Sequence, residues 1–138
     1  MKKLALAIFA VLITVSAACA DDFALIVNHA NPESSVTQAE AQAIFLGKKT
    51  SWPNGVGVLP VLQESSPVHQ EFTKAVVGKS PGQFSNYWKK ALFTGTGIPP
   101  RSLNGDGEVK AFVAANDGAI GYVTAAAVDD SVKKLEVR

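Results

Sequence analysis

Side chains suited to catalysis are sparse in this sequence of 138 residues. The two histidines, His29 and His69, form neither an H-x-x-x-H nor an H-E-x-x-H pattern, so we expect no zinc site. The acidic pairs at 21–22 and 129–130 are adjacent in sequence, and neighbouring carboxylates seldom point at one substrate. We therefore expect no enzymatic activity, no metal and no cofactor.

One segment has residue types that could bind a ligand. Ser65, Ser66 and Pro67 have the order typical of a helix start, with a hydroxyl residue at the cap and proline at the first helical position. The N–H groups of Val68 and His69 would then be free at the positive end of the helix dipole, which attracts anions. Two interpretations stay open: the Ser66 hydroxyl caps its own helix, or the segment binds an anion.

Helical spacing of apolar residues, together with start and stop residues, predicts four helices that would position this segment. The first follows the capping-box pattern of Thr37 to Glu40 and ends at Gly47, and the second runs from the Ser65–Pro67 segment to Gly78. The third opens at Ser80-Pro81, and the fourth runs from near Asp106 to near Asn116.

Short apolar runs predict the strands between these helices. The expected strands are 23–28, 56–62, 119–123 and 134–138, and residues 94–104 form a loop rich in glycine and proline. With 47% hydrophobic and 18% charged residues, the composition is typical of one globular domain. We predict an α/β fold, a small sandwich with a mixed sheet.

The first twenty residues are expected to be a signal peptide. Two lysines precede the apolar residues 4–15, and Ala18-Cys19-Ala20 has the A-x-A form of a cleavage site. Cleavage after Ala20 would leave a domain of residues 21–138 in the periplasm or outside the cell. In an alternative interpretation, Cys19 becomes an acylated first residue, although Ser16 stands where such signals usually have an aliphatic residue.

Loss of the signal peptide would change the formal net charge from +1 to about −1 and remove the only cysteine. A chain without excess basic charge is not expected to bind nucleic acid. The body also lacks an apolar run long enough to span a membrane.

Three stretches together resemble a known family. They are Ile44-Phe45-Leu46-Gly47-Lys48, Trp52-Pro53-Asn54-Gly55 and Gly118-Ala119-Ile120-Gly121-Tyr122-Val123. In order and spacing they resemble the periplasmic phosphate-binding protein of ABC phosphate transporters. The resemblance implies one lobe of a two-lobed α/β clamp, the type 2 periplasmic-binding fold, with phosphate held between the lobes.

The resemblance also implies site residues. The family segment Arg-x-Asp-x-Ser-Gly-Thr matches a stretch here that begins at Leu62, so Ser66 corresponds to the phosphate-binding serine. Glu64 takes the place of the aspartate that accepts the proton of hydrogen phosphate. Leu62, Pro67 and Val68 replace the arginine, the glycine and the threonine, which removes a charge, an N–H and a hydroxyl.

We therefore expect weak binding of phosphate or another small oxyanion. The expected ligand-binding residues are Glu64, Ser65, Ser66, Val68, His69 and Arg101. Arg101, Lys48 or Lys49 could restore positive charge. An ABC transporter is an expected partner, and self-association could complete the cleft.

A second function stays open. In this alternative the lobe binds no ligand, and an exposed opening that includes Trp52 and residues 93–101 contacts another envelope protein.

Overall fold

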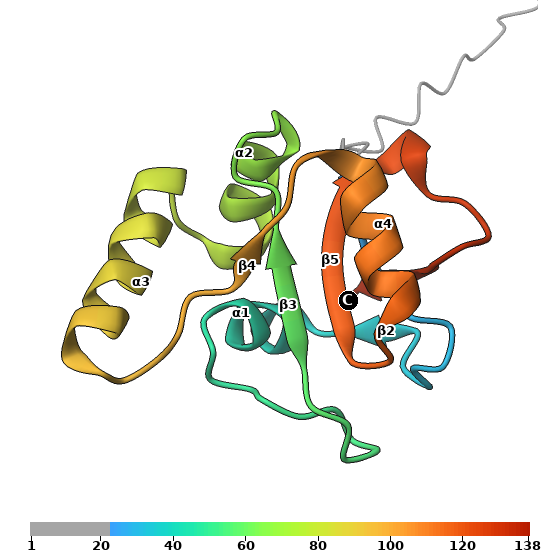
Figure 1. The fold of residues 1–138 in the computed structure, drawn as a ribbon, viewed down its shortest axis with the longest axis horizontal. Helices are drawn as coiled ribbons and strands as arrows, with labels where there is room; N and C mark the ends of the chain where they lie inside the picture. Colours follow the sequence, from blue (N-terminus) through green and yellow to red (C-terminus); the bar gives the residue numbers. More distant parts are fainter. Residues whose placement is uncertain (1–22) are drawn as a thin grey trace, which may run out of the picture.

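The computed structural model describes residues 23–138. The expected signal peptide, its cleavage site, Cys19 and the acidic pair 21–22 lie outside the described residues. The described strands form one sheet in the order β2-β6-β1-β5-β3-β4 (Figure 1). They are β1 (Phe23–Val27), β2 (Ser35–Val36), β3 (Leu59–Leu62), β4 (Arg101–Ser102), β5 (Ala119–Thr124) and β6 (Lys133–Val137). Strand β1 is antiparallel to β5 and β6, and the other pairs are parallel, so the sheet is mixed.

Helices cover both faces of the sheet, which confirms the predicted α/β sandwich. Helix α4 (Gly105–Ala115) packs on one face, and α1 (Gln38–Phe45) and α2 (Val68–Phe72) pack on the other; α3 (Pro81–Thr94) lies to the side of the sheet, beyond β4, and contributes to the same core as α1 and α2 (Figure 1). Helix α2 continues as the π-helical η1 (Thr73–Val77), and a 3-10 turn, η2 (Ala125–Ala127), follows β5. Within the described part of the chain, no helix has the length and hydropathy needed to cross a bilayer.

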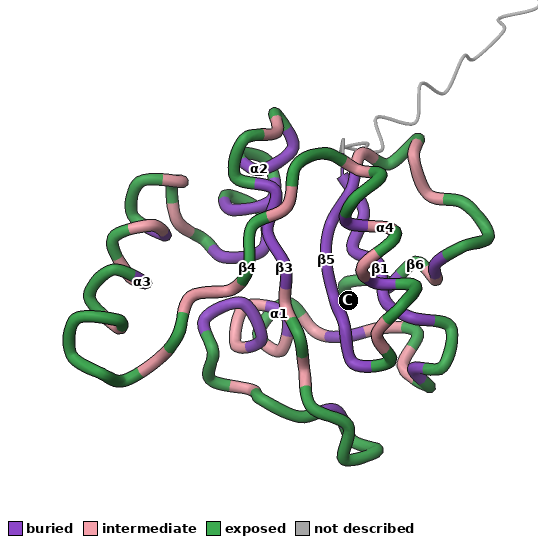
Figure 2. Tube along the Cα trace, viewed as in Figure 1, coloured by how far each residue is buried: buried purple, intermediate pink, exposed green. Residues whose placement is uncertain are grey.

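The alternation of side chains along β1 divides the core into two layers. Phe23, Leu25 and Val27 belong to the core under α1, α2 and α3, whereas Ile26 belongs to the core under α4. All of β1 is buried, as in a strand covered on both faces (Figure 2). The continuous apolar run therefore predicted this strand correctly.

The expected start signals of α1 and α3 are confirmed. The Thr37 hydroxyl accepts a hydrogen bond from the Glu40 N–H at 3.1 Å. Ser80 and Gln83 form a capping box at the start of α3: the Gln83 N–H donates to Ser80 Oγ at 3.2 Å, and the Ser80 N–H donates to Gln83 Oε1 at 3.0 Å. Both helices therefore begin where local hydrogen bonds satisfy their first N–H groups.

Two expectations about residues 52–62 are wrong. The strand predicted for 56–62 begins only at Leu59, because the preceding residues form a turn in which the Trp52 N–H donates to the Val56 carbonyl at 2.8 Å. Trp52 does not lie on an exposed opening: only 2% of it is accessible, and its Nε1–H donates to the Gly118 carbonyl at 3.0 Å. A tertiary hydrogen bond pulls this turn against the core.

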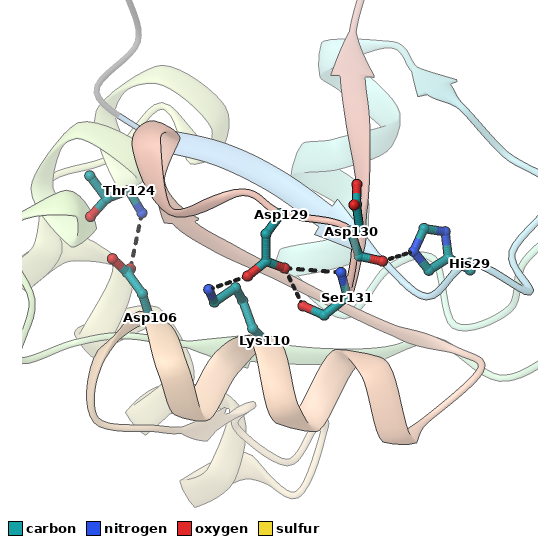
Figure 3. A network of polar contacts seen from close by, with 7 residues as sticks. All are labelled: His29, Asp106, Lys110, Thr124, Asp129, Asp130 and Ser131. Atoms are coloured by element: carbon teal, nitrogen blue, oxygen red, sulfur yellow. Dashed lines mark hydrogen bonds and ion pairs between the residues drawn. The ribbon is translucent and has the colours of Figure 1, made fainter.

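The acidic pair 129–130 helps to hold the segment between β5 and β6 (Figure 3). The Lys110 ammonium lies 2.8 Å from Asp129 Oδ2, and Ser131 donates to the same carboxylate through its N–H and hydroxyl. These hydrogen bonds keep the pKa of Asp129 well below its usual range. The Asp130 carbonyl accepts a hydrogen bond from His29 Nε2 at 2.6 Å.

Candidate functional site

The segment expected to bind a ligand begins at the carboxyl ends of two parallel strands. Leu62 in β3 is paired with Ser102 in β4, so the residues that follow the two strands leave the sheet at the same edge. The Glu64 N–H donates to Ser102 Oγ at 3.3 Å, and the Ser65 hydroxyl donates to Asn104 Oδ1 at 3.3 Å. These bonds bring two segments together that lie almost 40 residues apart in sequence.

The Ser66 hydroxyl does not cap helix α2. Pro67 occupies the cap position in a right-handed helical conformation, with no side-chain hydrogen bond to the first turn. The Ser66 N–H donates to the Gln63 carbonyl at 3.0 Å and so forms a tight turn before the helix. Ser66 is half-buried, and its hydroxyl has no hydrogen-bond partner within residues 23–138.

One of the two N–H groups expected to be free is occupied. The His69 N–H donates to the Ser66 carbonyl at 3.1 Å, so that expectation is wrong for His69. Across the described residues, the N–H groups of Ser65 and Val68 find no protein acceptor. Pro67 has no N–H, so the segment presents two unpaired amides and one unpaired hydroxyl.

The side chains of Val68 and His69 are buried rather than presented to solvent. His69 Nδ1 lies 2.5 Å from the Tyr122 hydroxyl oxygen, which also accepts the Gln63 N–H at 2.8 Å. Burial raises the pKa of Tyr122, so the hydroxyl keeps its proton and donates it to Nδ1. Burial lowers the pKa of His69, against the opposing effect of the Glu64 carboxylate, so the ring is neutral at pH 7 with its proton on Nε2.

A second set of hydrogen bonds fixes Gln63, the residue before Glu64. Its Nε2 donates to the Tyr122 carbonyl at 2.7 Å and to Asp106 Oδ1 at 3.0 Å. The same carboxylate oxygen accepts the Thr124 N–H at 3.0 Å (Figure 3). Burial raises the pKa of Asp106, but the hydrogen bonds from Gln63 and Thr124 outweigh it and lower the pKa. An ionised carboxylate on α4 therefore anchors the segment.

The basic residues expected to replace the lost arginine do not contact this segment. Leu62, at the arginine position, is 3% exposed and packs in the core. Arg101 is exposed on β4, and within residues 23–138 no ion pair or hydrogen bond joins it to Glu64 or Ser65. The Lys49 ammonium lies 3.4 Å from a carboxylate oxygen of Glu40 on α1.

Sequence reasoning missed three residues at this site: Ser102, Asn104 and Tyr122. Ser102 and Asn104 follow a long loop whose path the sequence does not determine. They lie beside the end of β3 because the two-residue strand β4 pairs with β3. Tyr122 had a usable signal, because a phenol hydroxyl inside the apolar run 119–123 must find a hydrogen-bond partner when it is buried.

Comparisons with known proteins agree with this architecture. The family described as "PBP superfamily domain" matches residues 13–137. No curated protein matches the chain.

Solved structures of longer chains share the fold. The chain is similar to an ABC-type phosphate transport receptor from Vibrio cholerae, with a TM-score of 0.63 and 22% identity over 83% of this chain and 45% of the receptor. It is similar to a candidate phosphate ABC transporter substrate-binding protein from Clostridium perfringens, crystallised with bound phosphate, with a TM-score of 0.67 and 25% identity over 84% of this chain and 44% of that one. PstS from Borrelia burgdorferi gives a TM-score of 0.64 and 12% identity over 85% of this chain and 47% of its own.

This chain thus corresponds to slightly less than half of each relative, as expected for a single lobe. The family consists of binding domains rather than of a class of enzymes. The chain belongs to the PBP superfamily domain family, as a single-lobe relative of the substrate-binding proteins of phosphate ABC transporters.

Proposed function

We propose that the protein is an exported solute-binding protein that binds phosphate or another small oxyanion weakly at the segment Glu64–His69. In this proposal residues 1–20 direct export and are removed after Ala20, so residues 21–138 act in the periplasm. The bound phosphate of the similar Clostridium perfringens protein supports the choice of ligand. An ABC transporter is the proposed partner.

The observation that carries the proposal is the unpaired polar group of Ser66. A serine that capped its own helix would direct its oxygen at the N–H groups of the first turn, whereas here the Ser66 hydroxyl and the nearby N–H groups of Ser65 and Val68 are unpaired in the described structure. All three can donate to an anion. The Glu64 carboxylate accepts a hydrogen bond from the protonated oxygen of the ligand, which favours hydrogen phosphate over fully ionised oxyanions.

Two features of the same segment make the binding weak. The buried Leu62 supplies no charge, and Pro67 supplies no N–H. A charge-assisted hydrogen bond contributes roughly 1.5 to 3 kcal/mol, so each one that is missing lowers the affinity by about one to two orders of magnitude. A single lobe also leaves the anion open to water.

Titration of the ¹⁵N-labelled mature chain with phosphate, sulfate and acetate tests the proposal. Phosphate should shift the amide resonances of Ser65, Ser66 and Val68 in a saturable manner. Ser66→Ala should weaken binding about tenfold, by the loss of one hydrogen bond to a charged group. Ser34→Ala, an exposed serine at the opposite edge of the sheet, is the matched control and should leave the affinity unchanged. No saturable shift at millimolar phosphate would reject the proposal.

A partner-binding role is the second candidate, and one surface favours it. Leu92, Phe93 and Ile98, at the end of α3 and in the loop after it, are 58%, 96% and 85% exposed. Apolar residues grouped in this way often mark protein contacts. Replacing Phe93 and Ile98 by serine should abolish co-purification with an envelope partner and leave the urea midpoint unchanged, since neither side chain is in the core. Co-purification that survives the double substitution would reject this surface.

A further inference from the structure

A cavity of about 130 Å³ lies between α2 and α3, and the proposed oxyanion site does not account for it. This volume corresponds to about four water molecules at roughly 30 Å³ each, which is the size of a compound with a few carbon atoms. Its polar lining consists of Glu64, His69, Ser85, Trp88 and Lys89. Its apolar lining includes Leu62, Phe84 and Leu92.

Trp88 contributes a buried hydrogen-bond donor that nothing satisfies. The residue is 7% exposed, and within the described residues its indole Nε1 has no hydrogen-bond partner. The benzene end of the indole, at Cζ3 and Cη2, lies beside Gly97 and Gly47, and Nε1 belongs to the pyrrole ring at the opposite end. The second tryptophan differs, because the Trp52 Nε1–H donates to a carbonyl oxygen. A buried N–H without a partner is unfavourable, so an acceptor beside Trp88 would stabilise the protein.

His69 contributes a second donor to the cavity. The Tyr122 hydroxyl donates to Nδ1 and thereby keeps the ring proton on Nε2. Nδ1 is occupied by this bond, so Nε2–H is the group that His69 can offer to a ligand in the cavity that it lines. The half-buried Ser85 adds a hydroxyl.

The two charged residues of the lining, Glu64 and Lys89, are both exposed. The Lys89 ammonium attracts an anion, and the Glu64 carboxylate opposes that attraction in part. The interior polar groups, His69 and Trp88, are donors, so the ligand must present an acceptor. The apolar wall favours a hydrocarbon group beside that acceptor and disfavours inorganic phosphate, which is polar on every side.

We propose that this cavity binds a small organic carboxylate. The carboxylate accepts hydrogen bonds from Trp88 Nε1 and His69 Nε2 and is attracted by Lys89, while a hydrocarbon group of about three to five carbons contacts Leu62, Phe84 and Leu92. This inference goes beyond the proposed oxyanion binding, which uses the Ser66 hydroxyl and the N–H groups of Ser65 and Val68, none of which lines the cavity; the Glu64 carboxylate borders both sites.

The two tryptophan indoles provide the test. In ¹⁵N spectra of the mature chain titrated with isovalerate, the Trp88 indole resonance should move downfield and saturate with a dissociation constant on the order of 1 mM. The Trp52 indole should not move, because its hydrogen bond to Gly118 is internal. Isovaleramide, which lacks the charge, and isobutylamine, which lacks the acceptor, should bind at least about threefold more weakly.

Two neighbouring lysines on α3 provide matched variants. Lys89→Gln should weaken isovalerate binding about threefold, whereas Lys90→Gln should leave it unchanged, because Lys89 lines the cavity and Lys90 does not. A Trp88 indole that none of the compounds shifts would show a cavity filled by water only and would overturn the proposal. Equal binding of isobutylamine would overturn the assignment to a carboxylate.

The same spectra separate this inference from the proposed function. Phosphate should shift the amides of Ser65, Ser66 and Val68 without shifting the Trp88 indole. Isovalerate should shift the indole even if phosphate binds nowhere. Failure of one titration therefore leaves the other proposal standing.

Discussion

Two serine–proline pairs open consecutive helices of this protein, and they do so by different means. At the start of α3, Ser80 accepts a hydrogen bond from the Gln83 N–H, and the Gln83 side chain returns one. At the start of α2, Ser66 makes no such bond. Sequence patterns that look alike therefore produce a closed helix start in one place and an open one in the other.

The difference lies in what holds each helix start. The start of α3 is held by its own capping box. The start of α2 is held from outside by the hydrogen bonds that link Tyr122 to His69 and Gln63. Because β5 fixes the turn before α2, Ser66 does not need to cap its helix. An open helix start thus depends on a buried tyrosine more than 50 residues away in sequence.

The largest expected effect follows from removing that tyrosine hydroxyl. Tyr122→Phe leaves two buried groups, the Gln63 N–H and His69 Nδ1, without their partner. Each unsatisfied buried group costs about 1 to 3 kcal/mol, so we expect a loss of about 2 to 6 kcal/mol in the free energy of unfolding. Urea unfolding of the wild-type protein and the variant, monitored by circular dichroism, measures this loss of free energy.

Tyr87→Phe is the matched control for this change. The Tyr87 hydroxyl donates to the Leu46 carbonyl at 2.7 Å, in a partly buried position. Its removal should cost only about 1 kcal/mol, because a single bond is lost and water can reach the carbonyl. If both tyrosine variants were equally stable, the start of α2 would not depend on Tyr122.

The two serines themselves give the next largest contrast. Ser80→Ala removes a helix cap and should cost about 1 kcal/mol of unfolding free energy. Ser66→Ala removes a hydroxyl without a structural partner and should change stability by less than about 0.5 kcal/mol. Chemical denaturation of both variants side by side checks the contrast. A loss at Ser66 as large as that at Ser80 would mean that Ser66 caps α2 in solution.

The two prolines test whether the open start is the anion site. Pro67→Ala adds an N–H at the start of α2 and should strengthen phosphate binding about tenfold, the effect of one hydrogen bond to a charged group. Pro81→Ala adds an N–H at the capped start of α3 and should leave phosphate binding unchanged. Isothermal titration calorimetry measures the phosphate affinity of each variant. Equal effects of the two substitutions would place the anion elsewhere.

The sequence predicted well the elements that local interactions determine. The buried run of β1, the Thr37 cap and the Ser80–Gln83 capping box all depend on residues within a few positions of one another. Composition and spacing therefore identified the α/β sandwich and its helix starts. The family resemblance added the single-lobe form, which length alone does not determine.

The errors occur where distant residues decide the local structure. Trp52 lies in a turn that would be exposed by itself, and a bond to Gly118 buries it. The His69 N–H was expected to be free because a helix start normally leaves it so, but the turn at Gln63 places the Ser66 carbonyl within its reach. The cavity between α2 and α3 likewise depends on how two helices pack, which periodicity does not determine.

The smallest expected effect concerns pH, and it again separates the two helix starts. Burial lowers the pKa of His69 below its ordinary value of 6.5, despite the opposing Glu64 carboxylate. Below pH 6.5 the unfolded chain therefore binds a proton at this residue that the folded chain does not. The contribution of His69 to stability is complete above pH 6.5 and is lost as the pH falls from 6.5 through the folded-state pKa.

Histidine ring resonances followed between pH 8 and 5 should give His69 a midpoint below 6.5. Over the same range the amides of Ser65, Ser66 and Val68 should shift with the His69 ring, because the imidazole lies beside the turn that precedes α2. Those of Ser80, Gly82 and Gln83 should remain in place, because the capping box of α3 contains no ionisable group. A His69 midpoint above 6.5 would mean that the Glu64 carboxylate outweighs burial. The ring would then be charged near neutral pH, and its hydrogen bond with Tyr122 would not be the one that holds the start of α2.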